Sequence, residues 1–201
     1  MKLSRSSSLL TGLSTIFVLL AWFFPVWSIR LCAPQYPEGL GMNLWMNHIS
    51  GINEFDIANM NLLNHYIGMA AIDENSIKEF HYTPYIIGVL CVITILNTYF
   101  KKTILLYFHS AFVVFFGLIG LADFWYWGYS YGHNLDPHAS IQFPGMNYQP
   151  PLLGCKEILN ITACSYPNIG ALLLFLAGVS LGISIIIALK CHKKKGIVIC
   201  D

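Results

Sequence analysis

The chain of 201 residues is 56% hydrophobic and only 10% charged, and it carries a formal net charge of +1. Soluble domains have about 25% charged residues, so this composition excludes a typical soluble enzyme and a disordered segment. The charge balance also lacks the basic surplus that binding to nucleic acid requires, and the class that fits is an integral membrane protein.

Four apolar segments are each long enough to cross about 30 Å of hydrocarbon, which takes roughly 20 helical residues. Pro84 suits the first turn of a helix, and Asn168 suits an N-cap. The segments run from Leu9 to Ile29, from Pro84 to Phe100, from Thr103 to about Tyr126 and from Asn168 to Leu189. We therefore expect an all-α membrane protein with four transmembrane helices.

The positive charges predict the orientation of these helices. Eight of the eleven Lys and Arg residues flank one side: Lys2, Arg5, Lys101, Lys102, Lys190, Lys193, Lys194 and Lys195. Because Lys and Arg concentrate on the cytoplasmic side, we expect both termini in the cytoplasm and a multi-pass protein of the bacterial inner membrane. The first apolar run is longer than the 7–15 residues of a cleaved signal core, so we expect it to be a retained anchor.

This orientation divides the chain into five parts. The cytoplasmic N-terminus and first transmembrane helix span residues 1–29, and the second and third transmembrane helices span 84–126. Outer loop A spans residues 30–83, outer loop B spans 127–167, and the fourth helix with a cytoplasmic tail spans 168–201. Loops of this length are usually functional or disordered. Both are rich in aromatic and aliphatic residues, so we expect them to form a compact extracytoplasmic cap.

Loop A contains one segment with a helical pattern, near Asp56–Met69. We expect Asp56 to cap this helix. A stripe of apolar residues at helical spacing supports the assignment: Ile57, Met60, Leu63 and Ile67.

Methionine and histidine concentrate in the two loops. Apart from Met1, all five methionines lie there: Met42, Met46, Met60, Met69 and Met146. Five of the seven histidines do so as well: His48, His65, His81, His133 and His138. Thioether and imidazole ligands together select Cu(I), whereas two imidazoles with a carboxylate also suit Cu(II), zinc or iron.

Three local arrangements supply the candidate metal ligands. Met42, Met46 and His48 follow one another closely, and His65 and Met69 share a helical face if their segment is helical. His133, Asp136 and His138 surround one turn. Each arrangement also has an ordinary structural explanation: methionines as core filler, His65 hydrogen-bonded within a packed cap, and the third group as turn chemistry.

The six cysteines differ in their expected roles. Cys155 and Cys164 both lie in loop B and predict a disulfide in an oxidising compartment, with a thiolate pair for copper as the alternative. Cys32 is outer and unpaired, and fits a ligand, a free thiol or a small buried residue. Cys91 is expected to pack within the second transmembrane helix, while Cys191 and Cys200 are expected to be reduced in the cytoplasm.

The third and fourth apolar segments contain polar and small residues of note. His109 and Asp123 are ionisable within the third segment and fit a functional role. Alternatively, His109 is hydrogen-bonded inside the bundle, and Asp123 lies at the membrane interface and bonds to Tyr or Trp neighbours. Gly178 and Gly182 have the spacing that permits close helix contact, and Gly117 and Gly120 are candidate partners.

Four motifs in the loops carry a resemblance to a known family: APQYPEGL at 33–40, NLLNHYIGM at 61–69, YGHNLDPH at 131–138 and PGMNYQPPLLG at 144–154. On these motifs, the chain resembles small bacterial four-helix membrane proteins of unassigned mechanism. Those proteins accompany the copper-delivery lipoprotein of nitrous-oxide reductase maturation. The resemblance implies a copper context and supplies no catalytic residues.

The preferred hypothesis is an accessory protein, not an enzyme, that binds or passes Cu(I) at the periplasmic face. Its partners would be the lipid bilayer and a periplasmic copper protein or membrane complex. One alternative is a redox membrane subunit that uses His65, His133 and His138 for haem, or a cap that binds quinol. Another is a structural subunit that docks a periplasmic partner through its aromatic loops.

Overall fold

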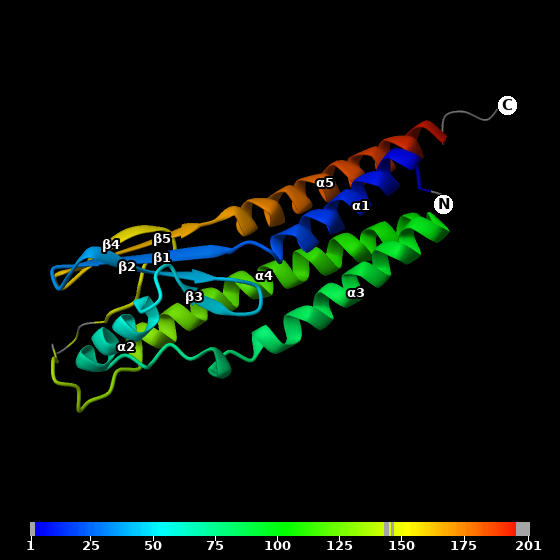
Figure 1. Ribbon diagram of the computed structural model, residues 1–201. Coiled ribbons are helices and arrows are strands. Elements are labelled where there is room, and N and C mark those ends of the chain that lie inside the picture. The colour runs from blue at the N-terminus through cyan, green and yellow to red at the C-terminus, as the bar shows by residue number, and fades with distance from the viewer. Residues whose placement is uncertain (1–2, 143–144, 146, 196–201) are drawn as a thin grey trace.

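The computed structural model describes residues 3–142, 145 and 147–195 (Figure 1). These residues form five α-helices and a five-stranded antiparallel sheet. The helices are α1 (Arg5–Ala21), α2 (Asp56–Ile67), α3 (Glu79–Phe100), α4 (Thr103–His133) and α5 (Ile169–Lys195), with a short 3-10 helix, η1 (Glu74–Ser76). The strands are β1 (Trp27–Ala33), β2 (Tyr36–Leu44), β3 (Ile49–Gly51), β4 (Gly154–Ile158) and β5 (Ile161–Pro167). The predicted all-α, four-helix architecture is therefore wrong.

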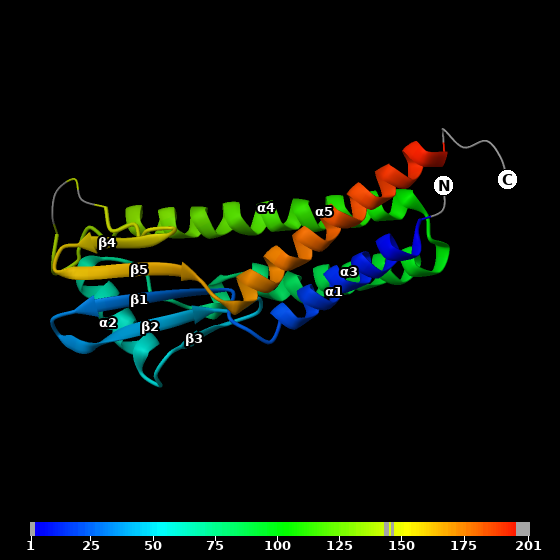
Figure 2. The same ribbon diagram turned by 90° about the horizontal axis from the view of Figure 1, so that it is seen from above.

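The helices α1, α3, α4 and α5 lie side by side, and the sheet lies at one end of this bundle (Figure 1). The N-terminal end of α1 and the C-terminal end of α5 lie together at the opposite end (Figures 1 and 2). Within the described chain, three helices are long and apolar enough to cross a membrane: Glu79–Phe100, Thr103–His133 and Ile169–Cys191. The chain is thus a membrane protein, in which α1, with 17 residues, is a shorter apolar helix.

The first apolar segment does not stay helical to Ile29 as expected. Helix α1 ends at Ala21, and Pro25 follows shortly afterwards. Proline lacks an N–H and biases the residue before it toward an extended conformation, so it favours a change of structure here. Beyond Pro25, buried Ile29 alternates with exposed Arg30, which is the period of a strand.

The sheet has the strand order β3-β2-β1-β5-β4, so it joins strands from both long loops (Figure 2). Ile29 of β1 pairs with Met42 of β2 on one side and with Ser165 of β5 on the other. We call the sheet, α2 and the described residues between Asn134 and Leu153 the cap. The continuous sheet explains why the two loops fold together: their backbone groups pair with each other.

One face of the sheet is covered and the other is open. Five buried residues form the core beneath the covered face: Ile29, Leu40, Met42, Ile49 and Met60. Phe124 and Trp127 of α4 pack against this core, so the covered, inner face lies toward α2 and the end of α4. The open, outer face carries the alternate residues of each strand, such as Arg30 and Cys32 of β1, and both of these residues are exposed.

Helix α4 continues past the predicted end near Tyr126 to His133. Its 31 residues correspond to about 46 Å at 1.5 Å per residue, which exceeds the roughly 30 Å of a hydrocarbon core. The aromatic side chains of the last turns explain this extension, since Trp127 and Tyr131 pack in the cap rather than in lipid. The third segment is therefore both a membrane helix and a part of the cap.

Asp56 has a different role from the helix cap that was expected. The structure places Phe55 at the N-cap of α2 and gives it no side-chain cap bond. The buried Asp56 carboxylate instead accepts hydrogen bonds from the backbone N–H of Gly41, at 3.0 Å, and of Asn53, at 2.9 Å. It thereby ties the start of α2 to strand β2 and to the turn that precedes the helix.

Hydroxyl side chains link the helices of the bundle beside two apolar clusters, whereas the predicted glycine contacts are not formed. Ser7 of α1 donates to the carbonyl oxygen of Ser184 at 3.0 Å, and Ser184 donates to that of Ser7 at 2.9 Å. Thr94 links α3 to His109 of α4, with 3.2 Å between its Oγ1 and the ring Nδ1. In contrast, a Cβ placed on any of the four glycines of the predicted contact, Gly117, Gly120, Gly178 and Gly182, would meet nothing within 4 Å.

Candidate functional site

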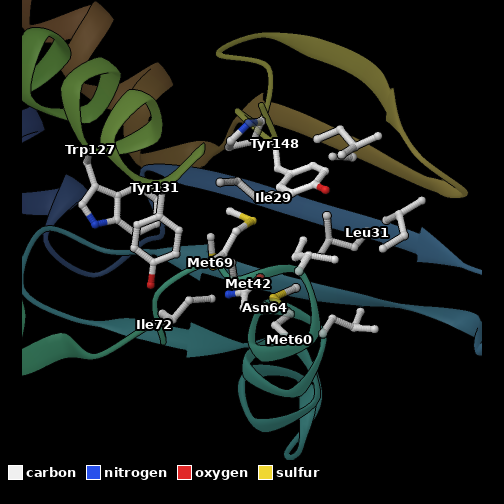
Figure 3. Close-up of a pocket in the computed structure, with 16 residues that line it drawn as sticks. Ile29, Leu31, Met42, Met60, Asn64, Met69, Ile72, Trp127, Tyr131 and Tyr148 are labelled. Atoms are coloured by element: carbon white, nitrogen blue, oxygen red, sulfur yellow. The ribbon is translucent and has the colours of Figure 1, made fainter. Parts of the chain in front are cut away.

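The cap contains a partly open cavity of about 80 Å³ between the inner face of the sheet and the two helices beneath it (Figure 3). Strands β1, β2, β4 and β5, helix α2, the last turns of α4 and the chain before β4 all contribute to its wall. The lining residues are Ile29, Leu31, Met42, Met60, Leu63, Asn64, Ile67, Met69, Ile72, Trp127, Tyr131, Tyr148, Pro150, Ile158, Ile161 and Ala163.

Three methionines from separate segments line this cavity (Figure 3). Met42 lies on β2 and is 4% exposed, because strand alternation turns it to the inner face along with Leu40. Met60 lies on α2 and is 1% exposed, because its helical face also carries Leu63. Met69 follows the end of α2 and is half-buried.

Gly68 returns the chain toward the cavity at the end of α2. Its φ of +80° is in the left-handed region, which ends the helix, and the N–H of Met69 then donates to the carbonyl of Asn64 at 2.9 Å. A Cβ at Gly68 would also lie 2.9 Å from the carbonyl oxygen of Asp136. Glycine at this position therefore sets the place of Met69 and permits close contact with the loop that follows α4.

The polar groups in the wall are few and uncharged. The amide of Asn64 donates to the carbonyl of Ala70 at 3.4 Å. The hydroxyl of Tyr131 is buried and has no hydrogen-bond partner among the described atoms, while its ring packs 4.4 Å from that of Trp127. Of the sixteen described lining residues, none carries a charge.

Tyr148 closes the cavity from the side of the chain before β4. It is 2% exposed, and its N–H donates to the carbonyl of Gly132 at 3.0 Å. This approach requires glycine, because a Cβ at Gly132 would overlap the backbone of Gln149. The last turn of α4 is thus in direct contact with the segment that contains Tyr148 and Gln149.

The structure brings together only some of the predicted metal ligands. Met42 and Met69 line the cavity, whereas Met46 packs against a cluster in the bundle that includes Val18 and Leu90. Met146 and Cys200 lie outside the described residues. Two of the three predicted methionine ligands therefore line the cavity, and the third does not.

The predicted imidazole and carboxylate ligands lie elsewhere. His65 on α2 is exposed, and His48 stacks on Trp45 at 5.0 Å between ring centroids. His133 is the last residue of α4 and stacks on Tyr129 at 4.0 Å.

Asp136 and His138 form a turn, since the Asp136 carboxylate accepts a hydrogen bond from the backbone N–H of His138 at 2.8 Å. Both side chains are exposed. Across the part of the chain that the structure describes, no three His, Cys, Asp or Glu side chains come together to hold a metal ion. Any soft-metal site in the cavity consequently depends on thioethers.

Met60 was predicted as a core residue of α2 but not as a ligand. The signal was present in the sequence, because Met60 belongs to the same helical stripe as Leu63 and Ile67. The missing information was that the inner face of β2, which carries Met42, packs opposite that stripe. Without the sheet, no spacing along the chain relates the two methionines.

The cysteines of the cap lie on the other side of the sheet. Cys155 of β4 and Cys164 of β5 form the expected disulfide, with 4.0 Å between their Cα atoms. Cys32 of β1 is an exposed free thiol. Of the remaining described cysteines, Cys91 is half-buried in α3 and Cys191 is exposed near the end of α5.

Comparison of the chain with protein-family models, with curated protein sequences and with solved structures finds no match.

Proposed function

We propose that this membrane protein binds Cu(I) in the cap cavity through the sulfur atoms of Met42, Met60 and Met69, as an accessory protein that holds or passes the ion. The observation that carries the proposal is the convergence of three methionines from β2, α2 and the following turn on one cavity. Thioethers are soft ligands, and soft ligands favour Cu(I) among the metals available to proteins.

The charge of the cavity favours a monovalent ion. Since none of the described lining residues is ionised, a bound ion keeps its full charge inside an apolar wall. The cost of burying a charge rises with its square, so a divalent ion would pay about four times the desolvation penalty of Cu(I). With the same neutral ligands, the cavity should therefore bind Cu(I) in preference to Zn(II) or Cu(II).

The size of the cavity argues against the larger cofactors that the sequence left open. Pockets for organic ligands and cofactors usually measure about 300–1,000 Å³. The volume of about 80 Å³ is well below this range, which favours an ion over a haem or a quinol.

The position of the cavity fits exchange with a partner at one side of the membrane. The cap lies at the opposite end of the bundle from the start of α1 and the end of α5 (Figure 1). The charge distribution along the sequence predicts that this end faces the periplasm. A copper protein at that face is the partner that this proposal requires, and its identity stays a prediction.

The test is Cu(I) binding to the full-length protein in detergent, measured by competition with a chromophoric Cu(I) chelator. Met42→Leu, Met60→Leu and Met69→Leu each remove one sulfur at nearly constant volume, and such exchanges usually cost less than about 1.5 kcal/mol of stability. We expect each variant to bind Cu(I) at least tenfold more weakly, equivalent to about 1.4 kcal/mol. Because thioethers do not titrate, the affinity of the unchanged protein should be constant between pH 7 and pH 5.

Met46→Leu is the matched control, since Met46 is half-buried but packs in the bundle cluster and not in the cavity. It should leave the affinity unchanged. If Met60→Leu and Met69→Leu bind Cu(I) as tightly as the unchanged protein, the methionines are packing residues and the proposal fails. An affinity that falls below about pH 6.5 and is lost in His65→Ala would instead identify imidazole ligands.

A further inference from the structure

The outer face of the sheet gathers three of the chain's six cysteines. Cys155 and Cys164 are direct partners across β4 and β5, and Cys164 is at the same time the direct partner of Arg30 on β1. Side chains of direct antiparallel partners lie on the same face, so the disulfide and Arg30 share the outer face.

Cys32 belongs to the same group. It lies two residues after Arg30 on β1 and pairs with Thr162, which lies two residues before Cys164 on β5. This register makes Cys32 a diagonal neighbour of Cys164, and diagonal neighbours in a sheet lie about 7–8 Å apart. The free thiol and the disulfide are therefore neighbours on one surface, although in this oxidised form of the described chain the three sulfurs do not form a metal-binding group.

This surface is open to other molecules. Cys32 and Cys155 are both exposed, whereas α2 and the end of α4 lie beneath the opposite face. Cys155 also lies on β4, which is a terminal strand of the sheet, with its sulfur 3.4 Å from the hydroxyl of Tyr166. A reductant can therefore reach the disulfide without unfolding the cap.

We propose that the Cys155–Cys164 disulfide is a redox gate over a second Cu(I) site, formed by Cys155, Cys164 and Cys32 when the disulfide is reduced. The inference rests on the proposed function only for the identity of the ion. Thiolates are soft ligands and bind Cu(I) more strongly than neutral thioethers do, because they also offset its charge.

The chemistry needs one external reductant, a dithiol. One dithiol transfers two electrons and two protons to the protein, so that the bond between the sulfurs of Cys155 and Cys164 breaks and the reductant leaves as its own disulfide. Cu(I) then displaces the two thiol protons and forms two copper–sulfur bonds. The resulting centre has a net charge of −1, which the cationic Arg30 on the same face compensates, and Cys32 is placed to add a third sulfur.

The two sites are separated by the sheet itself. Ile29, Leu31 and Ala163 line the methionine cavity on the inner face, while their neighbours in sequence, Arg30, Cys32 and Cys164, lie on the outer face. Loss of one site should consequently leave the other site intact, and this independence permits a direct test.

The experiment counts Cu(I) ions bound by the full-length protein in detergent, with the chelator competition described above. We expect one ion in the oxidised protein, and two after treatment with a phosphine reductant that is then removed. The second ion should bring the ultraviolet charge-transfer absorption of a copper–thiolate. The double variant Cys155→Ser/Cys164→Ser should bind one ion under both conditions, and it retains every other cysteine of the chain as a control.

Two further variants sharpen the result. Cys32→Ser should weaken the second ion at least tenfold, whereas Cys91→Ser, which changes a half-buried cysteine of α3, should have no effect. Met60→Leu/Met69→Leu should lose the first ion and keep the second, so failure of the cavity and failure of the cysteine site are distinguishable. The inference is overturned if reduction adds no copper, or if the reduced protein binds Zn(II) in preference to Cu(I).

Discussion

The bundle and the cap differ in how many hydroxyl groups they bury. Between the helices, buried Ser7, Thr11 and Ser184 lie beside apolar clusters, whereas the core of the cap consists of apolar residues such as Ile29 and Met42. Helices surrounded by lipid gain little from apolar burial against each other and associate through close packing and hydrogen bonds. A domain exposed to water is stabilised mainly by removing apolar surface from water. The same chain therefore uses two stabilising principles, one at each end.

This comparison assumes that the two ends lie on different sides of a membrane, and the native cysteines can test it. Cys32 is exposed in the cap, and Cys191 is exposed near the end of α5. In intact cells, a membrane-impermeant maleimide should label the protein at Cys32 only, with Cys32→Ser abolishing the signal. Permeabilised cells should gain label in the C-terminal region. Labelling of Cys191 in intact cells would reverse the assigned orientation.

The cap should be sensitive to added volume where its segments approach closely. Gly132→Ala places a Cβ against the backbone of Gln149, and overpacking of this kind usually costs about 1–3 kcal/mol. We expect a lower melting temperature and faster proteolysis of the cap. Gly128→Ala, one turn earlier on α4, meets nothing within 4 Å and should be neutral or stabilise the helix by up to about 1 kcal/mol. Equal effects of the two substitutions would show that the segment that contains Tyr148 and Gln149 is not held by α4.

Removal of a hydroxyl group from the bundle should lower the free energy of unfolding only slightly, and only where that hydroxyl has a hydrogen-bond partner. Ser184→Ala removes the reciprocal bonds with Ser7, and interhelical hydrogen bonds of this type average about 0.6 kcal/mol in membranes. Ser14 is fully buried too, but its hydroxyl has no partner among the described residues, so Ser14→Ala should cost nothing or should stabilise. The measurement is the unfolding free energy in mixed micelles. A larger loss from Ser14→Ala would contradict the role given to the hydroxyl pairs.

The sequence was sufficient for the parts of the fold that depend on local pattern. Long apolar runs predicted the membrane helices α3, α4 and α5, and a helical stripe predicted α2. The strands were missed because β1 continues an apolar run from α1, and because pairing of β1 with β5 joins residues 130 to 140 positions apart. Pro25 and the alternation around Arg30 were the available signals for the end of the helix.

Some residues of the candidate site could be predicted, but not their geometry. The concentration of methionine and histidine in the loops predicted soft ligands, which stays a prediction, and the structure places Met42 and Met69 on one cavity. It leaves His65 exposed, since the inner face of α2 already carries Met60 and Asn64. Spacing along one helix indicates which residues share a face, but not which face the sheet will cover.

The continuous helix α4 fixes the height of the cavity above the lipid. Counted from Thr103 at 1.5 Å per residue, Trp127 lies about 36 Å and Tyr131 about 42 Å along the axis. With Thr103 at one edge of roughly 30 Å of hydrocarbon and a headgroup layer of about 5–8 Å, these positions lie at the outer boundary of that layer and just beyond it. A molecule diffusing in bulk solution must therefore approach the lipid surface to reach the cavity. A molecule tethered to the same bilayer would stay at that height and would reach the cavity by diffusion in two dimensions.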